Sequence, residues 1–399
     1  SVVRPVPAGR YTRSLVAGRT NGRRLRVAFV DQSGDAAGGA EESLALLLRY
    51  LPPDIDPRVV VFDDGAFADR LRSWGIDVSC VKIASSAAEA TRERAGYAAA
   101  WAAAPAVPRL AALFRSQHVD VVHTNTVKAH FIGGAAARFA GIPSVVHFRD
   151  LLEGRARAFA RFAGRSCSTQ RIAITQAVSA WYGLDRTSVV DEPLDLARYV
   201  GPRLRAEARA RLGLPADPPI VAIVGRINRW KGHDRFVRAA ALVAARTDAH
   251  FAIVGAPVFR DADFAEELRA LTARLGIGDR VTFVPWTDDV DDVYAAIDVH
   301  CNCSTREPFG RTTVEAAVAG VPTVCFADGG AAEAIVDGRT GVAVPRGNVR
   351  AFAQAVERYV VDPVLRRGDG ERGRAYVARY DARRHAENVA AIIRRAARH

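Results

Sequence analysis

Short apolar runs that alternate with helical segments, and then start again after a break, restrict the fold of this chain more than any other feature. In the first half of the chain the runs are Leu25–Val30, Val59–Phe62, Val119–His123 and Ser144–Phe148. Helical patterns such as Ala40–Tyr50 and Ala129–Ala140 lie between them. Short, continuously apolar runs are typical of buried strands in a parallel sheet. The alternation therefore predicts an α/β fold with a doubly wound sheet.

The pattern stops near Pro193–Gly213 and then begins again. The later strands are predicted at Ile220–Val224, His250–Val254, Val281–Val284, Val299–Cys303 and Thr323–Ala327, with helices such as Phe264–Leu275 and Thr312–Ala319 between them. We therefore expect two Rossmann-like domains that face a cleft, with ligands at the carboxyl ends of the strands. The predicted division is a basic leader at 1–24, a first domain at 25–195, a second domain at 196–380, and an amphipathic helix at 381–399 that packs back on the first domain.

The composition is that of a soluble globular protein with a basic balance. Of the 399 residues, 49% are hydrophobic and 25% are charged, and the formal net charge is +12. Only three of the 56 basic residues are lysine, and alanine is abundant, which indicates a coding bias and weakens a nucleic-acid interpretation. The positive balance favours anionic partners such as phosphates, acidic substrates or a membrane face.

Cysteine usage and hydropathy indicate a cytoplasmic protein. The five cysteines are scattered and odd in number, which is typical of a reducing compartment. Cys301 and Cys303 are too close together for the usual zinc pair, and no second pair accompanies them. No segment reaches the ~18 apolar residues of a membrane-spanning helix, and the first residues lack the apolar core of a signal peptide.

The loop that follows Ile220–Val224 contains two cations. Gly225 permits a sharp turn at the strand end, and Arg226 and Lys231 then lie at the predicted mouth of the cleft. Two fixed cations suit a diphosphate that gains negative charge as its bond to a sugar breaks. The alternative is a solvated loop with ordinary surface charges, although lysine is rare in this chain.

The segment from Glu307 to Glu315 is the strongest candidate site. It follows the predicted strand Val299–Cys303 and enters the helix Thr312–Ala319. Gly310 permits close approach of the backbone, and the free amides at the start of the helix form an anion site. Glu315 is placed to hold a vicinal diol and Glu307 to accept from sugar hydroxyls. The alternatives are a favourable acid near a helix start and a solvent-exposed loop acid.

These motifs resemble the retaining glycosyltransferases of family 4, which have the GT-B fold of two Rossmann-like domains. The Glu-x7-Glu signature of that family appears as Glu307 and Glu315, and its Gly-Arg…Lys-Gly pattern appears as Gly225-Arg226…Lys231-Gly232. Three further segments follow in the family's order: Phe251–Gly255, Glu315–Pro322 and Gly329–Gly341. The resemblance covers essentially residues 25–399 and is more specific in the second domain.

The resemblance assigns roles to residues of the second domain. It implies that Arg226 and Lys231 bind the donor diphosphate, that Glu315 binds the ribose, and that Glu307 binds the transferred sugar. Amides around Phe309, Gly310, Arg311 and Thr312 would cover sugar and phosphate, although many relatives have an aliphatic residue where Arg311 stands. The base would lie near Val284–Trp286. No metal or other cofactor is implied, because the nucleotide sugar is a substrate.

In the first domain the resemblance is looser. Gly38 and Gly39 are similar to a glycine-rich loop that faces the donor phosphates, although Glu41 and Glu42 also simply favour a helix start. Relatives often have a histidine near the end of the strand Ser144–Phe148, where this chain has His147 and, at the equivalent place, Arg149. Residues two apart on a strand share a face, so we predict that both orient the sugar. A satisfied histidine and an Arg149–Asp150 surface pair are the alternative.

Three further groups are left open. His123, Asn125 and Lys128 end another predicted strand, where they would line the acceptor side. The run Asp288–Asp292 contains an Asp-x-Asp metal motif, but acids at a helix start explain it more simply. The arginines between Arg155 and Arg171 alternate with Phe159 and Phe162, which fits either an anionic membrane surface or a solvated helix.

The sequence therefore predicts a hexosyltransferase that uses a UDP- or GDP-sugar and acts with retention on a sugar, lipid-linked or small-molecule acceptor. The protein would contribute positioning and electrostatic stabilisation. A nucleotide-sugar epimerase of the same fold, a sugar-polymer phosphorylase and a non-catalytic binding protein are the alternatives. The intact Arg226, Lys231, Glu307 and Glu315 argue against the last of these.

Overall fold

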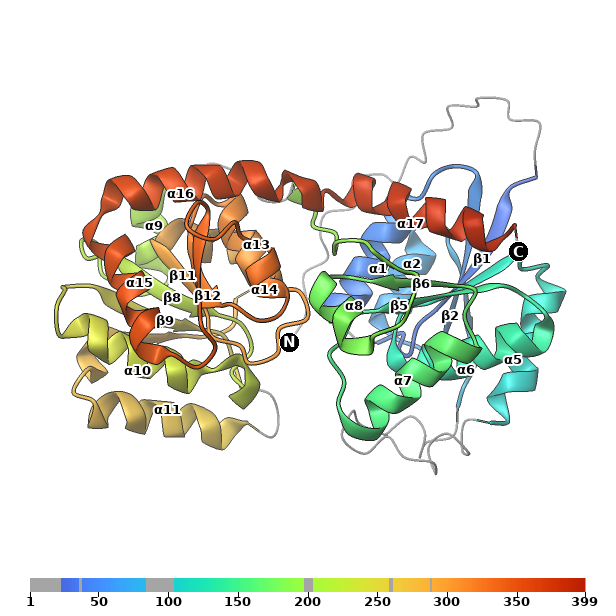
Figure 1. The fold of residues 1–399 in the computed structure, drawn as a ribbon, viewed down its shortest axis with the longest axis horizontal. Helices are drawn as coiled ribbons and strands as arrows, with labels where there is room; N and C mark the ends of the chain where they lie inside the picture. The colour runs from blue at the N-terminus through green and yellow to red at the C-terminus, as the bar shows by residue number, and fades with distance from the viewer. Residues whose placement is uncertain are drawn as a thin grey trace. The chain divides into compact units, whose positions relative to one another are not determined.

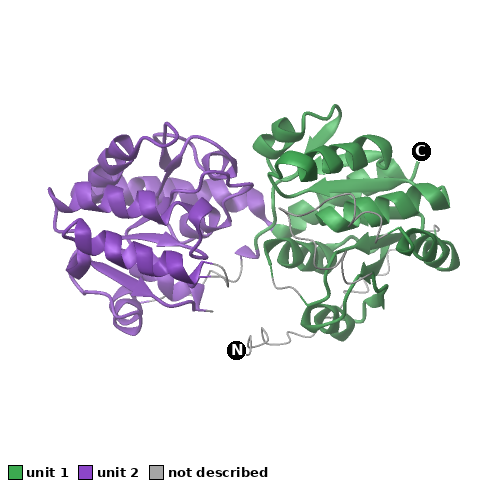
Figure 2. Ribbon diagram, turned by 90° about the horizontal axis from the view of Figure 1, so that it is seen from below, with its two compact units in different colours: residues 1–194, 382–399 green, residues 195–381 purple. Residues whose placement is uncertain are grey.

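The computed structural model describes residues 23–35, 38–83, 104–196, 204–257, 261–287 and 289–398. The predicted basic leader at 1–24 lies almost wholly outside these ranges. The chain forms two compact units, Ser1–Leu194 with Ala382–His399 and Asp195–Asp381 (Figure 2), here called unit 1 and unit 2. Both units contain a fully parallel sheet with helices on its two faces, which is the α/β arrangement predicted from the alternation of apolar runs.

Unit 1 contains a seven-stranded sheet in the order β3-β2-β1-β4-β5-β6-β7. The strands are β1 Leu25–Val30, β2 Ile55–Val61, β3 Asp77–Cys80, β4 Val121–Thr124, β5 Ser144–Phe148, β6 Gln170–Ala173 and β7 Thr187–Val189. The helices are α1 Gly39–Tyr50, α2 Ala66–Ser73, α5 Ala106–Ser116, α6 Val127–Ala140, α7 Gly154–Ser166, α8 Gln176–Tyr182 and α17 Ala382–Ala396 (Figure 1). The strand order reverses between β1 and β4, so the carboxyl ends of these two strands mark the switch point where ligands of such sheets bind.

Alternation along β1 explains the two layers of helices in unit 1. Val27 and Phe29 belong to a core with α1, α2 and α17, whereas Ala28 and Val30 belong to a core with α5 and α6. Successive side chains of a strand point to opposite faces, so a strand buried on both faces is apolar throughout. The last helix, α17, contributes an apolar stripe to the first core and packs against α1.

Unit 2 contains a six-stranded sheet in the order β10-β9-β8-β11-β12-β13. The strands are β8 Ile220–Val224, β9 His250–Val254, β10 Val281–Val284, β11 Val299–Asn302, β12 Thr323–Phe326 and β13 Gly341–Val344. The α-helices are α9 Arg205–Arg211, α10 His233–Ala244, α11 Ala262–Arg274, α12 Val290–Ala296, α13 Arg311–Val318, α14 Gly330–Glu333, α15 Val349–Val361 and α16 Pro363–Tyr376, with short 3-10 turns at Arg229–Lys231, Gly278–Arg280 and Val377–Tyr380. Here the switch point lies between β8 and β11.

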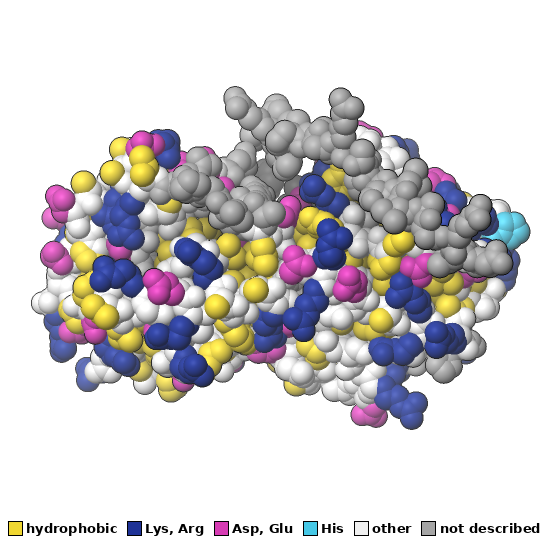
Figure 3. All heavy atoms as spheres, turned by 90° about the horizontal axis from the view of Figure 1, so that it is seen from above, with side chains coloured by type: hydrophobic (Ala, Val, Ile, Leu, Met, Phe, Trp, Pro, Cys, Tyr) yellow, Lys and Arg dark blue, Asp and Glu magenta, His cyan; other side chains and the backbone are white. Residues whose placement is uncertain are grey.

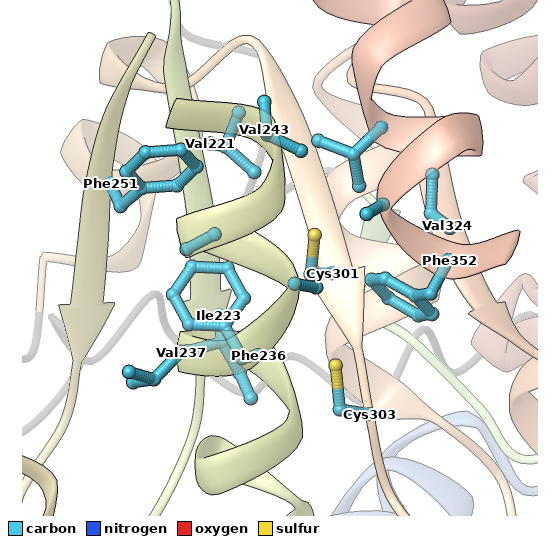
Figure 4. Close-up of a cluster of buried hydrophobic side chains, with 14 of the residues drawn as sticks. Val221, Ile223, Phe236, Val237, Val243, Phe251, Cys301, Cys303, Val324 and Phe352 are labelled. Carbon is cyan, nitrogen blue, oxygen red and sulfur yellow. The ribbon is translucent and has the colours of Figure 1, made fainter. Parts of the chain in front are cut away.

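The core of unit 2 includes two of the cysteines (Figure 4). Cys301 and Cys303 lie among Val221, Phe236 and Phe352. Burial raises the pKa of the Cys303 thiol well above its ordinary value, so the group is a neutral apolar side chain here. All five cysteines are free, and Cys80 and Cys167 are half-buried rather than fully buried. Within the described part of the chain, no helix is long and apolar enough to cross a bilayer.

Candidate active site

The turn after β8 holds Lys231 tightly against the end of β11. Gly232 has a φ of 74°, and a Cβ added there would lie 2.1 Å from the carbonyl oxygen of Cys303. The Asn228 side chain accepts a hydrogen bond of 3.2 Å from the Lys231 amide. Only glycine therefore permits this approach of the two loops. Arg226, at the start of the same turn, is exposed.

The close approach brings Lys231 to Glu307. The Lys231 Nζ atom lies 2.7 Å from Glu307 Oε2, and the two side chains are 17% and 7% exposed. Ser304 donates to the same carboxylate oxygen over 2.9 Å. Lys231 also lies over the Trp230 ring, with Nζ 4.3 Å from its centroid. Two motifs that are 76 residues apart in the sequence thus form one charged pair.

A pair of glycines fixes the loop that carries Glu307. The Gly330 amide donates to the Glu307 carbonyl over 2.7 Å. A Cβ at Gly330 would lie 2.4 Å from Phe309 Cα, and one at Gly310 would lie 2.7 Å from Ala331 Cα. Gly310 has a φ of 88° and is the N-cap of α13. The loop and the start of α14 are therefore in backbone contact.

Helix α13 begins directly after this loop and carries Glu315. The Tyr294 hydroxyl donates to Glu315 Oε2 over 3.0 Å, and Arg311 Nε donates to Oε1 over 3.1 Å. Phe309 is buried, and its ring centroid lies 5.3 Å from that of Tyr380. Arg311 is the first residue of the helix and is bound to the carboxylate that the sequence assigns to the ribose.

A small recess lies where these segments meet. Polar groups of Lys231, Asn302, Ser304 and Thr312 line it, and Ile223, Val224, Cys301 and Cys303 complete the lining. The recess is at the carboxyl ends of β8 and β11, which is the switch point of the sheet. Lys231 and Thr312, in the first turn of α13, thus border the same recess.

Several residues of this site were missed by the sequence reasoning. Tyr294 and Ser304 hold the two glutamates, and Gly329 and Gly330 support the loop between them. Ser304 lies three residues before Glu307 and just after a predicted strand, which is a detectable signal. Tyr294 lies on α12 and reaches Glu315 only through the tertiary fold, so no local pattern indicates its role.

In unit 1, Gly38 and Gly39 start helix α1. The Gly38 amide donates to Glu41 Oε2 over 3.1 Å, and Glu41 is buried. Burial raises the pKa of the Glu41 carboxyl. Glu42 pairs with Arg70 over 2.7 Å. Both acids thus have local partners, in agreement with the helix-start interpretation.

His147 and Arg149 are buried at the end of β5. His147 is fully buried, and the Arg149 side chain is 4% exposed and lies 2.5 Å from Glu192. Arg149 also donates to Asn125 Oδ1 over 2.7 Å and lies 3.2 Å from His147 Nδ1. Both side chains are thus engaged inside unit 1. The alternative of an Arg149–Asp150 surface pair does not describe Arg149, which is buried and paired with Glu192.

The neighbouring polar residues of β4 are buried as well. His123 Nε2 lies 3.3 Å from His147 Nδ1, and Asn125 Nδ2 donates to Asp31 Oδ2 over 2.6 Å. Lys128 is half-buried on α6, and burial lowers the pKa of its ammonium. Of the three groups predicted to line the acceptor side, only Lys128 thus retains partial exposure.

The acidic run Asp288–Asp292 begins helix α12. Asp288 lies outside the described residues. Asp292 forms a bidentate pair with Arg211, with distances of 2.6 and 2.8 Å. A carboxylate in this arrangement is held by a guanidinium fork, which accounts for the acid without a metal. No group of three or more His, Cys, Asp or Glu side chains within the described ranges is arranged to hold a metal ion.

The arginine-rich run lies on and after α7 and has two kinds of members. Arg157 donates to the Trp181 carbonyl over 2.5 Å and lies over that ring, and Arg171 donates to the Gly164 carbonyl. Arg155 and Arg165 are exposed, as is Phe162 at 61%. Lys and Arg side chains are spread over both units on the face drawn in Figure 3, with Asp and Glu among them.

Two family models match the chain. The model described as Glycosyltransferase Family 4 matches residues 37–198, and the model described as Glycosyl transferases group 1 matches residues 205–376. The D-inositol 3-phosphate glycosyltransferase of Rhodococcus jostii (strain RHA1) is 36% identical over 214 residues, which are 52% of this chain and 45% of that relative. The enzyme of the same name from Streptomyces avermitilis is 31% identical over 299 residues, which are 68% of this chain and 62% of that relative. The matched part thus spans about half to three fifths of these relatives.

Solved structures show the same architecture. Anabaena Alr3699/HepE, in complex with UDP and glucose, aligns with a TM-score of 0.77 at 26% identity, over 92% of this chain and 99% of that chain. A glycosyltransferase from Rickettsia africae ESF-5 shares the fold, with a TM-score of 0.80 at 18% identity over 94% of this chain and 98% of that chain. With two Rossmann-like units of the GT-B fold and a family model matched to most of each, the chain belongs to glycosyltransferase family 4.

Proposed function

We propose that this glycosyltransferase moves a hexosyl unit from a UDP- or GDP-sugar to a hydroxyl acceptor, with retention at the anomeric carbon. The observation that carries the proposal is the contact of Lys231 with Glu307 beside the amino end of α13. The UDP and glucose complex of the Anabaena structure, at 26% identity, supports a nucleotide-sugar donor.

The diphosphate of the donor would lie between cations and helix amides. Breaking the bond to the sugar leaves extra negative charge on the terminal phosphate, so groups that strengthen their interaction with that charge lower the barrier. Lys231 is held rigidly and partly buried, and Arg226 is exposed on the same turn. The amides of Phe309, Gly310, Arg311 and Thr312 begin α13, whose positive dipole end favours an anion.

The two glutamates, Glu307 and Glu315, would bind different parts of the donor. A carboxylate has about four acceptor positions on its two oxygens, so Glu315 can accept ribose hydroxyls while keeping the Tyr294 and Arg311 contacts. Glu307 has Lys231 and Ser304 on Oε2. Its Oε1 atom would accept from hydroxyls of the sugar, and the ammonium beside it holds the carboxylate in one orientation.

The transfer step needs no metal in this proposal. The departing phosphate oxygen would take the proton of the acceptor hydroxyl on the same face of the sugar, so the configuration is retained and the charges balance. Protein groups then contribute position and electrostatics. Full activity in the presence of excess EDTA is the expected outcome, and loss of activity that Mg²⁺ or Mn²⁺ restores would contradict it.

In unit 1, Gly38 and Gly39 would offer amides to the donor, and His147 and Arg149 would influence the orientation of the sugar. Both side chains are buried, so an influence through neighbouring groups fits them better than direct contact. The acceptor is proposed only as a hydroxyl of a sugar, a lipid-linked glycan or a small molecule. D-inositol 3-phosphate, named for the curated relatives, belongs in any acceptor panel.

The test is a turnover assay with a panel of UDP- and GDP-sugars, each with and without acceptors. We expect one donor to yield a free nucleoside diphosphate and a product with the anomeric configuration of the donor. Conversion of the donor sugar to its epimer without any acceptor would favour the epimerase alternative. Absence of binding and hydrolysis for every donor would refute the proposal.

We also propose contact of α7 with an anionic membrane surface through Arg155, Phe162 and Arg165. An exposed aromatic ring between arginines is the pattern of a helix that lies at a lipid interface. Co-sedimentation with vesicles that contain phosphatidylglycerol is the test, with Arg155→Gln/Arg165→Gln as the variant. Equal sedimentation of variant and wild type would refute this contact.

A further inference from the structure

The carboxyl ends of three strands in unit 1 are joined by a buried polar network centred on Arg149. Each of the three guanidinium nitrogens has a contact: Nε with Asn125 Oδ1 at 2.7 Å, one terminal nitrogen with Glu192 Oε2 at 2.5 Å, and the other with His147 Nδ1 at 3.2 Å. Asp31, Asn125 and His147 are fully buried. A guanidinium has its donors in a planar fork. Arg149 therefore orients its three partners, Asn125, Glu192 and His147, around one plane.

The network continues from Arg149 to helix α1 by two routes. Glu192 accepts from Arg149 with one oxygen and from the Ser43 hydroxyl with the other. Asn125 accepts from Arg149 and donates to the Ala40 carbonyl over 3.1 Å. Ala40 and Ser43 both belong to the first turns of α1, which begins at the Gly38–Gly39 turn. The amino end of α1 is thus attached to Arg149 through one acid and one amide.

The buried charges of Arg149 and Glu192 show that the contacts of this network are specific. Arg149 and Glu192 are both almost fully buried, and breaking such a pair leaves an uncompensated charge in the interior. Asn125 also donates to Asp31 at the end of β1. Because a guanidinium only donates, His147 must accept with Nδ1, and its proton lies on Nε2. One arginine thus sets the orientation of an amide, an acid and an imidazole.

We infer that Arg149 is a positioning residue that holds the amino end of α1, with the Gly38–Gly39 turn, against the carboxyl ends of β4 and β5. It acts through Glu192–Ser43 and Asn125–Ala40 and does not touch substrate. The inference rests on the proposed function, in which this turn serves the donor. Arg149, which stands where a histidine is expected at the end of β5, therefore has a different role: it fixes the position of α1.

The conservative variant Arg149→Lys separates this role from a purely electrostatic one. A lysine keeps the positive charge but is a compact donor that cannot hold Asn125, Glu192 and His147 in one plane. We expect kcat to fall about tenfold or more, because a displacement of ~1 Å near a reaction can cost roughly 100-fold in rate. The affinity for UDP should change less than about threefold, since most of the residues proposed to bind the nucleotide lie in unit 2 and are untouched by the change.

The Ser43→Ala variant tests the route to α1 and is expected to fold, because it removes one hydroxyl from a fully buried small side chain. We expect kcat to fall about fivefold or more in the wild-type background, because the lost hydrogen bond has a carboxylate as its acceptor. In the Arg149→Lys background the same change should have little further effect, because the route is already broken. Additive losses would overturn the inference, as would wild-type kcat in Arg149→Lys.

A matched control lies in unit 2. Arg209 and Asp298 form an equally buried pair, with exposures of 3% and 2%, at the amino ends of β8 and β11. Arg209→Lys should lower thermal stability as Arg149→Lys does, but leave kcat within about twofold of wild type. An equal loss of kcat in both variants would mean that general destabilisation explains the effect, and would contradict the inference.

Hydrogen exchange of peptides over residues 38–50 provides a readout that does not depend on activity. Arg149→Lys should increase exchange in the first turns of α1 more than in α2 or α6. If wild type binds no nucleotide sugar, the proposed function fails while the exchange result still tests the attachment. Unchanged exchange in α1 would refute the attachment even in a fully active enzyme.

Discussion

The two units have the same sheet plan but use the carboxyl ends of their strands in opposite ways. In unit 2, Lys231 and Glu307 meet beside a recess, and Arg226 is exposed. In unit 1, Arg149 and Glu192 meet at the equivalent edge with almost no exposed surface. The same topology thus places a charged pair beside a recess in one unit and encloses a charged pair within a polar network in the other.

The loops account for this difference. In unit 2, glycines at 232, 310, 329 and 330 allow backbones to approach without side chains between them, so Lys231 and Glu307 meet beside the recess. In unit 1, the residues after β4 and β5 are Asn125 and Arg149, and Glu192 covers them. Buried charges of this kind require complete hydrogen bonding. Substitutions at these two loops of unit 2 should therefore affect ligand binding more than folding, whereas those in the buried network of unit 1 should lower stability as well as activity.

The largest expected effect comes from Lys231→Ala in unit 2. The variant removes the cation proposed to bind the donor diphosphate, so kcat/KM should fall by about 100- to 1,000-fold, the usual result of losing one such group. Lys82→Ala is the matched control, because this exposed lysine of unit 1 has no role in the proposed site. Steady-state kinetics with the active donor is the measurement. Equal kinetics in both variants would remove Lys231 from the site.

The second prediction concerns the acid response of unit 1. Burial and then Glu41 raise the pKa of Asp31 from 3.8 to about 7. A raised carboxyl pKa contributes stability that is fully present below the unfolded value of 3.8 and is lost as the pH rises to about 7. Buried histidines of this unit have the opposite effect: burial lowers the pKa of His385 and of His130 to about 3, so their contribution is lost as the pH falls below 6.5.

Asp31→Asn should therefore change the pH dependence of the free energy of unfolding in unit 1 alone. In wild type, Asp31 adds stability as the pH falls from about 7, which offsets the loss from the buried histidines. The variant lacks this offset. As the pH is lowered from about 7 to about 5, its free energy of unfolding should fall more steeply than that of wild type, by about 1.4 kcal/mol per pH unit. Urea unfolding at several pH values, with hydrogen exchange to separate the units, is the measurement. A parallel pH dependence in variant and wild type would contradict the prediction.

The third prediction concerns the glycine approach in unit 2. Gly232→Ala would place a Cβ 2.1 Å from the Cys303 carbonyl oxygen, whereas Gly276, with a similar φ of 68°, has open space around it. Gly276→Ala is therefore the control. Both Gly232→Ala and Gly276→Ala incur the strain of a left-handed residue, about 1–2 kcal/mol. Only Gly232→Ala should also displace Lys231 and weaken UDP binding. Chemical denaturation and titration calorimetry measure the two effects, and equal UDP affinity in both variants would refute the claim.

The smallest expected effect is on the attachment of α17. Arg394 forms a bidentate pair with Asp54, but the two side chains are 37% and 45% exposed. Exposed pairs contribute about 0–1 kcal/mol, while the apolar stripe of α17 is fully within the core of unit 1. Arg394→Ala should lower the free energy of unfolding by less than ~1 kcal/mol by urea denaturation. A loss above ~2 kcal/mol would mean that the pair, and not the stripe, attaches the helix.

The sequence predicted most central strands, the edge strand β10 and the candidate loop at Glu307–Glu315, but missed β3, β6, β7 and β13. Strands β1, β8 and β9 are largely apolar runs, and their bounds were predicted as observed. Strands β3, β6 and β7 are three or four residues long and include polar residues such as Gln170 and Thr187, so no run marked them. Such short strands, at the edge of the sheet or next to it, depend on pairing with a neighbour rather than on their own pattern.

The same limit applies to the candidate site. Lys231, Glu307 and Glu315 were found because each stands in a local motif next to a glycine or a helix start. Tyr294 and Glu192 were missed because their partners are 21 and 43 residues away in the sequence. Arg149 was identified from its place at the end of β5, but its burial and its contact with Glu192 depend on the tertiary fold.

Hydrogen exchange with and without UDP tests the central claim that unit 2 holds the donor through its two loops. Saturating UDP should slow exchange in peptides that cover residues 225–232 and 307–315, and this protection should disappear in Lys231→Ala at the same UDP concentration. Peptides around Asn125 and Arg149 should change little, because those residues are internal supports. Protection confined to unit 1, or no protection at either loop of unit 2, would contradict the account.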